Sequence, residues 1–283
     1  MNNNIKDLYS TKVTDHDLTI ANKDKDGVLY SADGKRLLGI EHKDFSAYEY
    51  IIKEGTEVIC DHAFSCSSIR NIIIPDSVIV IGKRAFDECI KLQHVNIGKG
   101  VKTIKEFAFS RCNALDSVNI SNSITKICKF AFYGCLGIKE FIIPRNVEYI
   151  GKSAFQFCRN LKAVYIPDSV KYIGFKAFND CQWITVHRTR RRTWREYDSM
   201  NLIATTPGNK DRLVKMLPKF LHDIIEEMTY KEFINRQKSL YSNVNTEEEY
   251  DFGSLERVKC PRCGNWYFED DDVCDICGYP WNE

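Results

Sequence analysis

One stretch of the sequence decides the fold, and it reads Ile-Pro-Asp-Ser-Val-Lys-Tyr-Ile-Gly-Phe-Lys-Ala-Phe-Asn-Asp-Cys at residues 166–181. Its Ala-Phe pair and its cysteine return five more times upstream. The Ala-Phe pairs occupy residues 63–64, 85–86, 108–109, 131–132, 154–155 and 177–178. The cysteines that follow them are spaced 23 residues apart: Cys66, Cys89, Cys112, Cys135, Cys158 and Cys181. About half of the chain is therefore built from one repeated unit.

The repeated unit contains two short apolar segments. Leu161, Val164 and Ile166 follow the L-x-x-L-x-L spacing of a strand whose apolar side chains point inward. Val170 to Ile173 alternates between apolar and polar residues, which predicts a second short strand. A period of about 20–29 residues with this spacing is typical of a leucine-rich solenoid. Because one coil cannot bury its own apolar face, we expect the coils to stack about 4.8 Å apart and their phenylalanines to form one buried column.

The unit resembles the BspA-like leucine-rich repeats of bacterial and protist surface proteins through its pattern I-P-D-S-V-x-x-I-G-x-x-A-F-x-x-C. The resemblance implies a right-handed coil of period 23 over residues 51–186. It also implies an adhesin or an interaction scaffold, the usual roles in that family. This chain departs from the family in two respects: we find no export signal at its start, and it has a metal-binding motif near its end.

The N-terminal region is expected to cap the first coil, whose apolar surface and strand edges would otherwise be exposed. Residues 1–50 contain two apolar segments on either side of Asp33-Gly34, a strong signal for a two-residue turn. This pattern predicts a hairpin. In the first coil, Phe64 lies one residue closer to Cys66 than the other phenylalanines lie to their cysteines. We therefore expect a shortened turn between these two residues.

The region after the solenoid is expected to form a helical cap over residues 187–241. Thr193-x-x-Glu196 and Thr229-x-x-Glu232 fit the capping-box pattern, which predicts a helix after each threonine. Between them, apolar residues keep helical spacing from Leu213 to Met228. Residues 242–256 are acidic and rich in polar residues, and we interpret them as a linker.

One strong chemical motif lies in residues 257–283. Cys260-Pro-Arg-Cys263-Gly is followed after ten residues by Cys274-Asp-Ile-Cys277-Gly. Two C-x-x-C pairs at short separation supply four thiolates, the ligand set of tetrahedral structural zinc, and leave no open position for catalysis. The segment resembles a zinc ribbon, and we expect one structural zinc ion. The expected fold class is thus a β-rich α/β solenoid with a helical C-terminal cap and a small zinc-ribbon module.

The overall charge of the chain does not favour binding to nucleic acid or to membranes. The 283 residues include 40 basic and 39 acidic ones, so the formal net charge is +1. The first residues lack the apolar segment of a signal peptide, and no run approaches the roughly 20 apolar residues of a membrane span. We therefore expect a cytoplasmic protein without membrane insertion. In a reducing compartment the repeat cysteines should be reduced and buried.

The leading hypothesis is a protein–protein interaction scaffold without enzymatic activity. The sequence contains no phosphate-binding glycine-rich loop, nucleophile elbow or zinc-protease motif. One strand of the repeat should expose Ile73, Ile142 and Tyr165 at the ends of a polar sheet face, and the other should expose Tyr149 and Tyr172. Such residues on a regular face are suited to anchor a partner protein. The alternative for the two tyrosines is cross-coil stacking without a partner.

Two other hypotheses remain. Residues 187–195 contain five arginines, which together with the ribbon would suit a nucleic-acid-binding protein. Nucleic acid is disfavoured, however, because residues 257–283 hold three basic and six acidic residues, and this negative charge repels phosphate. The acidic linker also offers partners for the arginines. The other hypothesis is a cell-surface adhesin, as the family resemblance suggests.

Overall fold

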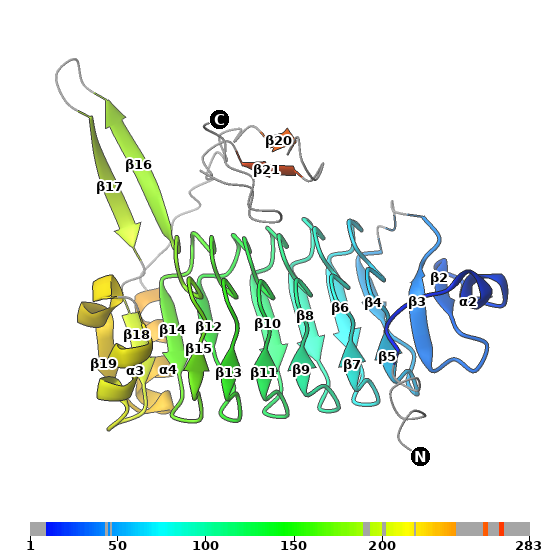
Figure 1. The fold of residues 1–283 in the computed structure, drawn as a ribbon, viewed down its shortest axis with the longest axis horizontal. Coiled ribbons are helices and arrows are strands. Elements are labelled where there is room, and N and C mark those ends of the chain that lie inside the picture. Colours follow the sequence, from blue (N-terminus) through cyan, green and yellow to red (C-terminus); the bar gives the residue numbers. More distant parts are fainter. Residues whose placement is uncertain are drawn as a thin grey trace. The chain divides into compact units, whose positions relative to one another are not determined.

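The structure is a computed structural model. It describes residues 10–42, 45, 47–188, 193–199, 202–217, 219–241, 257–259 and 266–268. The chain divides into two units, residues 1–236 and 237–283. The first unit contains the solenoid (Figure 1). The second contains an antiparallel pair of strands, β20 (Arg257–Lys259) and β21 (Trp266–Phe268).

Each coil of the solenoid contributes one short strand and one long strand. The short strands and the N-terminal hairpin form a nine-stranded sheet in the order β1-β2-β3-β5-β7-β9-β11-β13-β15. These strands are β1 (Asn22–Lys23), β2 (Val28–Tyr30), β3 (Arg36–Ile40), β5 (Val58–Ile59), β7 (Val80–Ile81), β9 (Thr103–Ile104), β11 (Lys126–Ile127), β13 (Tyr149–Ile150) and β15 (Tyr172–Ile173). From β3 onward they are parallel. The predicted leucine-rich repeat solenoid is confirmed.

The long strands form two four-stranded parallel sheets in the orders β4-β6-β8-β10 and β12-β14-β18-β19. They are β4 (Glu49–Ile51), β6 (Asn71–Ile74), β8 (His94–Ile97), β10 (Ser117–Ile120), β12 (Glu140–Ile142), β14 (Ala163–Ile166), β18 (Leu202–Thr205) and β19 (Ile225–Glu227). The strand pairing breaks between β10 and β12. Phe141 stands there where the neighbouring coils have valine, and its ring packs 5.2 Å from Phe132 and 4.7 Å from Phe155. We attribute the break to the larger volume of this side chain.

The predicted phenylalanine column forms the centre of the core. Consecutive rings from Phe64 to Phe178 lie 5.1–5.5 Å apart and are parallel to within 12°. All six rings are at most 2% exposed. Each coil thus covers the apolar face of its neighbour, which is how a solenoid closes a core that no single coil closes alone.

The repeat cysteines form a second buried column beside the rings. The Sγ atoms of Cys89, Cys112, Cys135, Cys158 and Cys181 donate to the carbonyl oxygens of Phe64, Phe86, Phe109, Phe132 and Phe155 at 3.0–3.1 Å. Burial raises the pKa of the Cys158 thiol to about 12, so it stays protonated and unreactive at neutral pH. The eight cysteines among the described residues form no disulfide.

The first member of this column is Ser67, and the expectation that Cys66 belongs to it is wrong. Ser67 is buried and its Oγ lies 3.4 Å from Sγ of Cys89, whereas Cys66 is exposed and left-handed at φ 63°. Ser67 follows Phe64 by three residues, as in the other coils, so the turn is not shortened there. The missing residue lies further on, because one residue separates Ser67 from Ile69 where the other coils have two.

Two backbone positions in each coil adopt the left-handed conformation. They lie one residue before the Ala-Phe pair and two residues after its phenylalanine, as at Phe107 (φ 58°) and Arg111 (φ 56°). Such a conformation costs about 1–2 kcal/mol per non-glycine residue. It is offset by bonds to the next coil, since Phe107 N donates to Lys129 O and Arg111 N to Tyr133 O. These positions form a corner beside the short-strand sheet.

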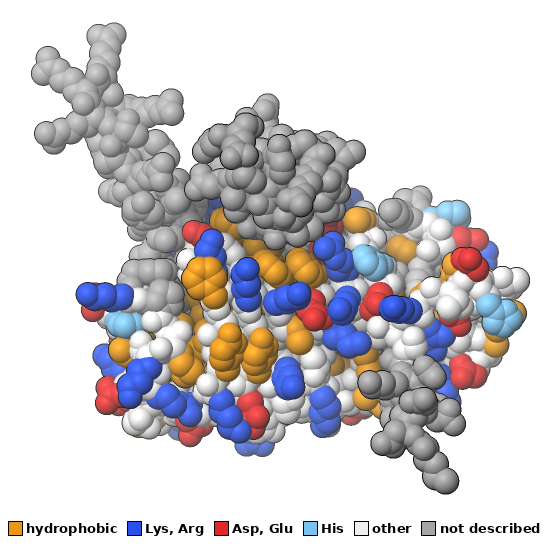
Figure 2. All heavy atoms as spheres, viewed as in Figure 1, with side chains coloured by type: hydrophobic (Ala, Val, Ile, Leu, Met, Phe, Trp, Pro, Cys, Tyr) orange, Lys and Arg blue, Asp and Glu red, His pale blue; other side chains and the backbone are white. Residues whose placement is uncertain are grey.

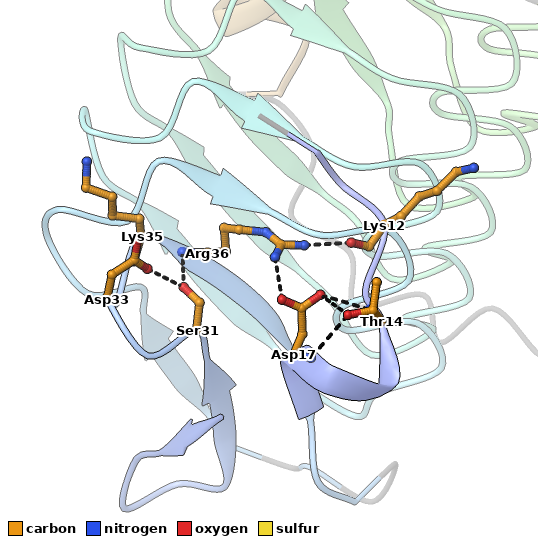
Figure 3. A network of polar contacts seen from close by, with 7 residues as sticks. All are labelled: Lys12, Thr14, Asp17, Ser31, Asp33, Lys35 and Arg36. Atoms are coloured by element: carbon orange, nitrogen blue, oxygen red, sulfur yellow. Dashed lines mark hydrogen bonds and ion pairs between the residues drawn. The ribbon is translucent and has the colours of Figure 1, made fainter. Parts of the chain in front are cut away.

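The N-terminal cap contains the predicted hairpin, with β2 and β3 antiparallel and Gly34 at φ 73° in the loop. The expected two-residue turn is wrong, because residues 31–35 connect the strands, with Gly34 N donating to Ser31 O. A short helix, α2 (Asp15–Thr19), begins with a capping box at Thr14. Arg36 ties the helix to the hairpin, because its Nη1 donates to Asp17 Oδ1 at 2.7 Å and its Nη2 to Lys12 O at 2.6 Å (Figure 3). This segment covers the outward side chain of Val58 on β5.

The C-terminal cap is only partly helical. Its helices are α3 (Lys210–Met216), the 3₁₀-helix η1 (Lys219–Ile224) and α4 (Tyr230–Tyr241). The helix predicted after Thr229 is confirmed as α4, with Thr229 N donating to Glu232 Oε2 at 2.6 Å and Glu232 N to Thr229 Oγ1 at 3.3 Å. The continuous helical spacing from residue 213 to 228 is interrupted, because residues 225–227 form β19 and pair with β18.

The helix predicted after Thr193 is wrong. Residues 182–188 and 193–199 form an antiparallel pair, β16 (Gln182–Arg188) and β17 (Thr193–Ser199) (Figure 1). A capping-box pattern involves only four residues and does not show whether the residues around it favour a helix or a strand. The β-branched and aromatic residues around it, such as Trp183, Ile184 and Val186, favour strands and pair along the whole length of β17.

Candidate partner-binding face

Tyr165 on β14 does not line an open face. Only 5% of its surface is exposed, because the rings of Tyr230 and Phe233 at the start of α4 lie 5.8 and 5.6 Å from its own. Ile142 on β12 packs against the same cluster and is half-buried. The expected exposure of Tyr165 is therefore wrong. The sheet continues into β18, and the helix covers both strands.

The middle of the long-strand sheet is polar, as expected, and its polar groups bond to one another. His94 Nδ1 and Ser117 Oγ lie 2.7 Å apart, and Asn119 Nδ2 donates to Asn96 Oδ1 at 3.1 Å. Ile73 lies half-buried on β6 at the N-terminal end of this face. These four side chains at the centre of the face are thus already bonded within the chain.

The short-strand sheet brings Tyr149 and Tyr172 together on its outward side. The two residues are paired in register on β13 and β15, and their rings stack 4.9 Å apart at an angle of 9°. They remain 37% and 50% exposed. The stacking expected in the absence of a partner therefore occurs, and it leaves the ring edges open to solvent.

A second group of aromatic residues, which the repeat pattern had not identified as a site, lies at the corner beside this sheet. Phe107 and Phe130 stack 4.7 Å apart and are both half-buried. Tyr133 joins Phe130 to Phe157 through edge contacts at 5.6 and 5.4 Å, and Phe175 in the last coil is 70% exposed. Alignment of the repeats on their Ala-Phe pairs would have found Phe107 and Phe130, because both directly precede such a pair.

The same side of the solenoid is strongly basic. We call the outward side of residues 79–84, 102–107, 125–130, 148–153 and 171–176 the lysine–aromatic face. These segments contain nine basic and two acidic residues, in a chain whose overall charge is nearly balanced. Figure 2 shows basic and hydrophobic side chains interleaved over this side of the molecule. The repeat therefore sorts charge by position, which the composition does not reveal.

Arg84 links the face to a buried carboxyl group. Its guanidinium Cζ lies 4.5 Å from the centre of the Phe107 ring, and its Nη1 lies 3.1 Å from Asp87 Oδ2. Asp87 is 6% exposed, and burial raises its pKa to about 6 although Arg84 and a hydrogen bond with Ser110 oppose the shift. The carboxyl group thus titrates close to neutral pH.

Several predicted site residues lie outside the described residues: Cys260, Cys263, Cys274 and Cys277 of the metal motif, and Arg190, Arg191 and Arg192 of the basic run. Within the part of the chain that the structure describes, no group of three or more His, Cys, Asp or Glu side chains is arranged to bind a metal ion. No helix in that part has the length and apolar character needed to cross a membrane.

Comparison with known proteins agrees with this architecture. Residues 57–185 match the family model of the BspA type leucine rich repeat region, in six copies. No curated protein matches the chain.

Solved structures of similar proteins include a leucine-rich repeat protein of T. pallidum, at 24% identity and a TM-score of 0.46, covering 58% of this chain and 76% of that one. The pneumococcal vaccine antigen PcpA is 18% identical with a TM-score of 0.45, and the match covers 74% of this chain and 46% of PcpA. A leucine-rich cell surface protein from Faecalibacterium prausnitzii is 20% identical with a TM-score of 0.42, covering 62% and 57%. The chain thus spans less than two thirds of the last two proteins.

Proposed function

We propose that this chain, a BspA-type leucine-rich repeat protein, is a non-catalytic scaffold that binds a partner protein on its lysine–aromatic face. The exposure of Tyr149, Tyr172 and Phe175 on neighbouring coils carries the proposal. Aromatic side chains of this size are frequent anchors of protein interfaces, because they bury a large area when a partner covers them.

The rigidity of the face supports this assignment. Tyr149 and Tyr172 lie on paired strands and stack on each other, as do Phe107 and Phe130 at the corner. Side chains that are ordered before binding lose little conformational entropy when a partner docks. The long-strand face is less suited, since its largest aromatic residue, Tyr165, is already covered by α4.

Photo-crosslinking tests which face binds. With benzoylphenylalanine in place of Tyr172, the chain should crosslink a protein in an extract of its own cells, because the ring edge lies at the proposed contact. The same substitution at Lys139, exposed on the long-strand side, is the matched control and should give no such product.

We also expect Tyr149→Ala with Tyr172→Ala to reduce capture of that protein at least about ten-fold. Crosslinking at position 139 but not at 172 would contradict the proposal.

We also propose that residues 257–283 bind one structural zinc ion through the two C-x-x-C pairs. The chemistry of four cysteine thiolates fits zinc. The pairing of Lys259 with Trp266 supports the proposal, because it brings the ends of β20 and β21 together directly before and after the segment that contains Cys260 and Cys263. Zinc would supply folding free energy to this small unit and no catalysis.

Elemental analysis tests the zinc proposal. Protein purified without chelator should contain one zinc per chain, since structural zinc binding is worth about 10–16 kcal/mol in comparable peptides. Cys274→Ser should lower the zinc content, whereas Cys66→Ser, at an exposed cysteine of the solenoid, should leave it unchanged. Zinc far below one equivalent in the unaltered chain would refute the proposal.

A further inference from the structure

The lysine–aromatic face has an excess of positive charge that the described residues of the chain do not neutralise. Six of its lysines form no ion pair with any described residue: Lys102, Lys105, Lys126, Lys129, Lys152 and Lys176. Its two acidic residues are already engaged, because Glu106 lies 3.8 Å from Lys83 and Glu148 lies 2.7 Å from Lys171. A partner that fits this face must therefore bring negative charge.

The positive charges and the aromatic rings share the same columns of the repeat. Lys126 is paired in register with Tyr149, which is paired with Tyr172 in the next coil. At the corner, Lys129 directly precedes Phe130, whose backbone N donates to Lys152 O in the next coil. Ser153, which follows Lys152, donates its backbone N to Phe175 O in the coil after that. Adjacent coils lie about 4.8 Å apart, so charged and apolar contacts alternate along the solenoid at short intervals.

The way the rings stack decides between the chemical classes of anionic partner. Single-stranded nucleic acid binds such faces by stacking bases on the flat side of aromatic rings. Here one flat side of each ring in the two stacked pairs is already covered: Tyr149 and Tyr172 cover each other, as do Phe107 and Phe130, and Arg84 lies over the other side of Phe107. This arrangement leaves fewer flat sides for bases to stack on, and it exposes ring edges, against which apolar side chains pack.

We infer that the lysine–aromatic face binds an extended acidic polypeptide segment whose carboxylate side chains alternate with apolar ones. The carboxylates pair with the six lysines, and the apolar side chains contact the ring edges. The inference rests on the proposed function and specifies its partner. Aromatic exposure points to a protein partner, and the lysines without an ion pair, together with the partly covered ring faces, point to its acidic, partly apolar character.

A labelled synthetic peptide tests the inference on the full-length chain. A peptide of about ten residues that alternates Glu with Leu is long enough to cross the coils between residues 102 and 176, at about 3.4 Å per residue. Fluorescence anisotropy should show binding that weakens at least ten-fold when NaCl rises from about 50 to about 300 mM. Peptides with Gln in place of Glu, or Ser in place of Leu, should bind at least ten-fold more weakly.

Charge reversal on the protein locates the site. Lys126→Glu with Lys129→Glu should weaken peptide binding at least ten-fold, whereas Arg70→Glu with Lys139→Glu, exposed on the long-strand side, should leave it unchanged. Equal melting temperatures of the two double variants establish that both fold. Equal loss of binding in both, or binding that ignores salt, would overturn the inference.

Two further probes are expected to bind weakly. Tighter binding of oligothymidylate or of phosphatidylserine vesicles than of the acidic peptide would overturn the inference in favour of nucleic acid or a membrane surface. Failure of the inference about the partner and failure of the proposed function give different experimental results. A protein crosslinked at position 172 together with no binding of acidic peptide would refute only the partner chemistry, whereas crosslinking at position 139 alone would refute the face itself.

Discussion

Phe109→Ala is expected to lower the free energy of unfolding of the solenoid by about 3–5 kcal/mol, the range for removing a buried phenylalanine ring. Phe109 is fully buried in the middle of the phenylalanine column, 5.1 Å from Phe86 and 5.5 Å from Phe132. Its neighbours are held by strand pairing on both sides and cannot collapse into the space. Because each coil contacts only the adjacent ones, the cavity also weakens the coupling between the two halves of the stack.

Phe175→Ala is the matched control for this prediction. It removes the same ring from a position that is 70% exposed, and it should change the unfolding free energy by less than about 0.5 kcal/mol. Urea unfolding followed by circular dichroism measures both variants. Equal effects at the two positions would show that the column does not form the core.

The second large effect concerns the pH dependence of stability at Asp87. The pKa of this carboxyl is about 6 in the folded chain, against 3.8 for the unperturbed group. Since the folded pKa is the higher one, folding favours the protonated acid. The contribution of Asp87 to stability is therefore lost as pH rises from about 4 to about 6, at a cost of about 3 kcal/mol above that range.

Asp87→Asn should remove this loss, because the amide stays neutral and keeps a group that can bond to Ser110. We expect the variant to gain about 1–3 kcal/mol over the unaltered chain at pH 7, after loss of the Arg84 ion pair, and to gain nothing at pH 4. The measurement is the difference in unfolding free energy between the two proteins across this pH range, which cancels the titration of other groups.

Arg84→Met provides the opposite test at the same site. It keeps an apolar stem over Phe107 but removes the charge 3.1 Å from Asp87, so the buried carboxylate loses its partner. This variant should be destabilised at pH 7 and much less so at pH 4, where Asp87 is protonated. A stability difference for Asp87→Asn that does not vary with pH would show that the carboxyl group titrates normally.

The regular part of the fold could be predicted from spacing alone. The inward positions of Leu161, Val164 and Ile166 and the column of rings follow from local rules that each coil repeats, and the N-terminal hairpin follows from its local turn residues. Stacking translates one coil onto the next, so a residue at a given repeat position meets its own equivalent. The α4 start at Thr229 is equally local, since its capping box involves only four residues.

The errors arose where a local pattern met a distant segment or a deletion. Thr193 fits a capping box, but it lies in a strand that pairs with residues 182–188. Cys66 keeps the 23-residue spacing by coincidence. The position in the cysteine column lies three residues after the phenylalanine of each coil, which is Ser67 in the first coil, and the missing residue lies after Ser67. Periodicity fixes the order of positions, and only the packed coil shows which residue fills each one.

The sequence by itself determined the solenoid and its phenylalanine column, because these depend on contacts between equivalent residues of adjacent coils. The tertiary structure alone decided which outward residues are available. Tyr165 lost its exposure to α4, which begins some 65 residues later in the chain. This burial depends on a contact between residues far apart in sequence, and neither composition nor period encodes such a contact. The lysines of five separate coils, by contrast, lie in equivalent segments of the repeat, which stacking places on one side.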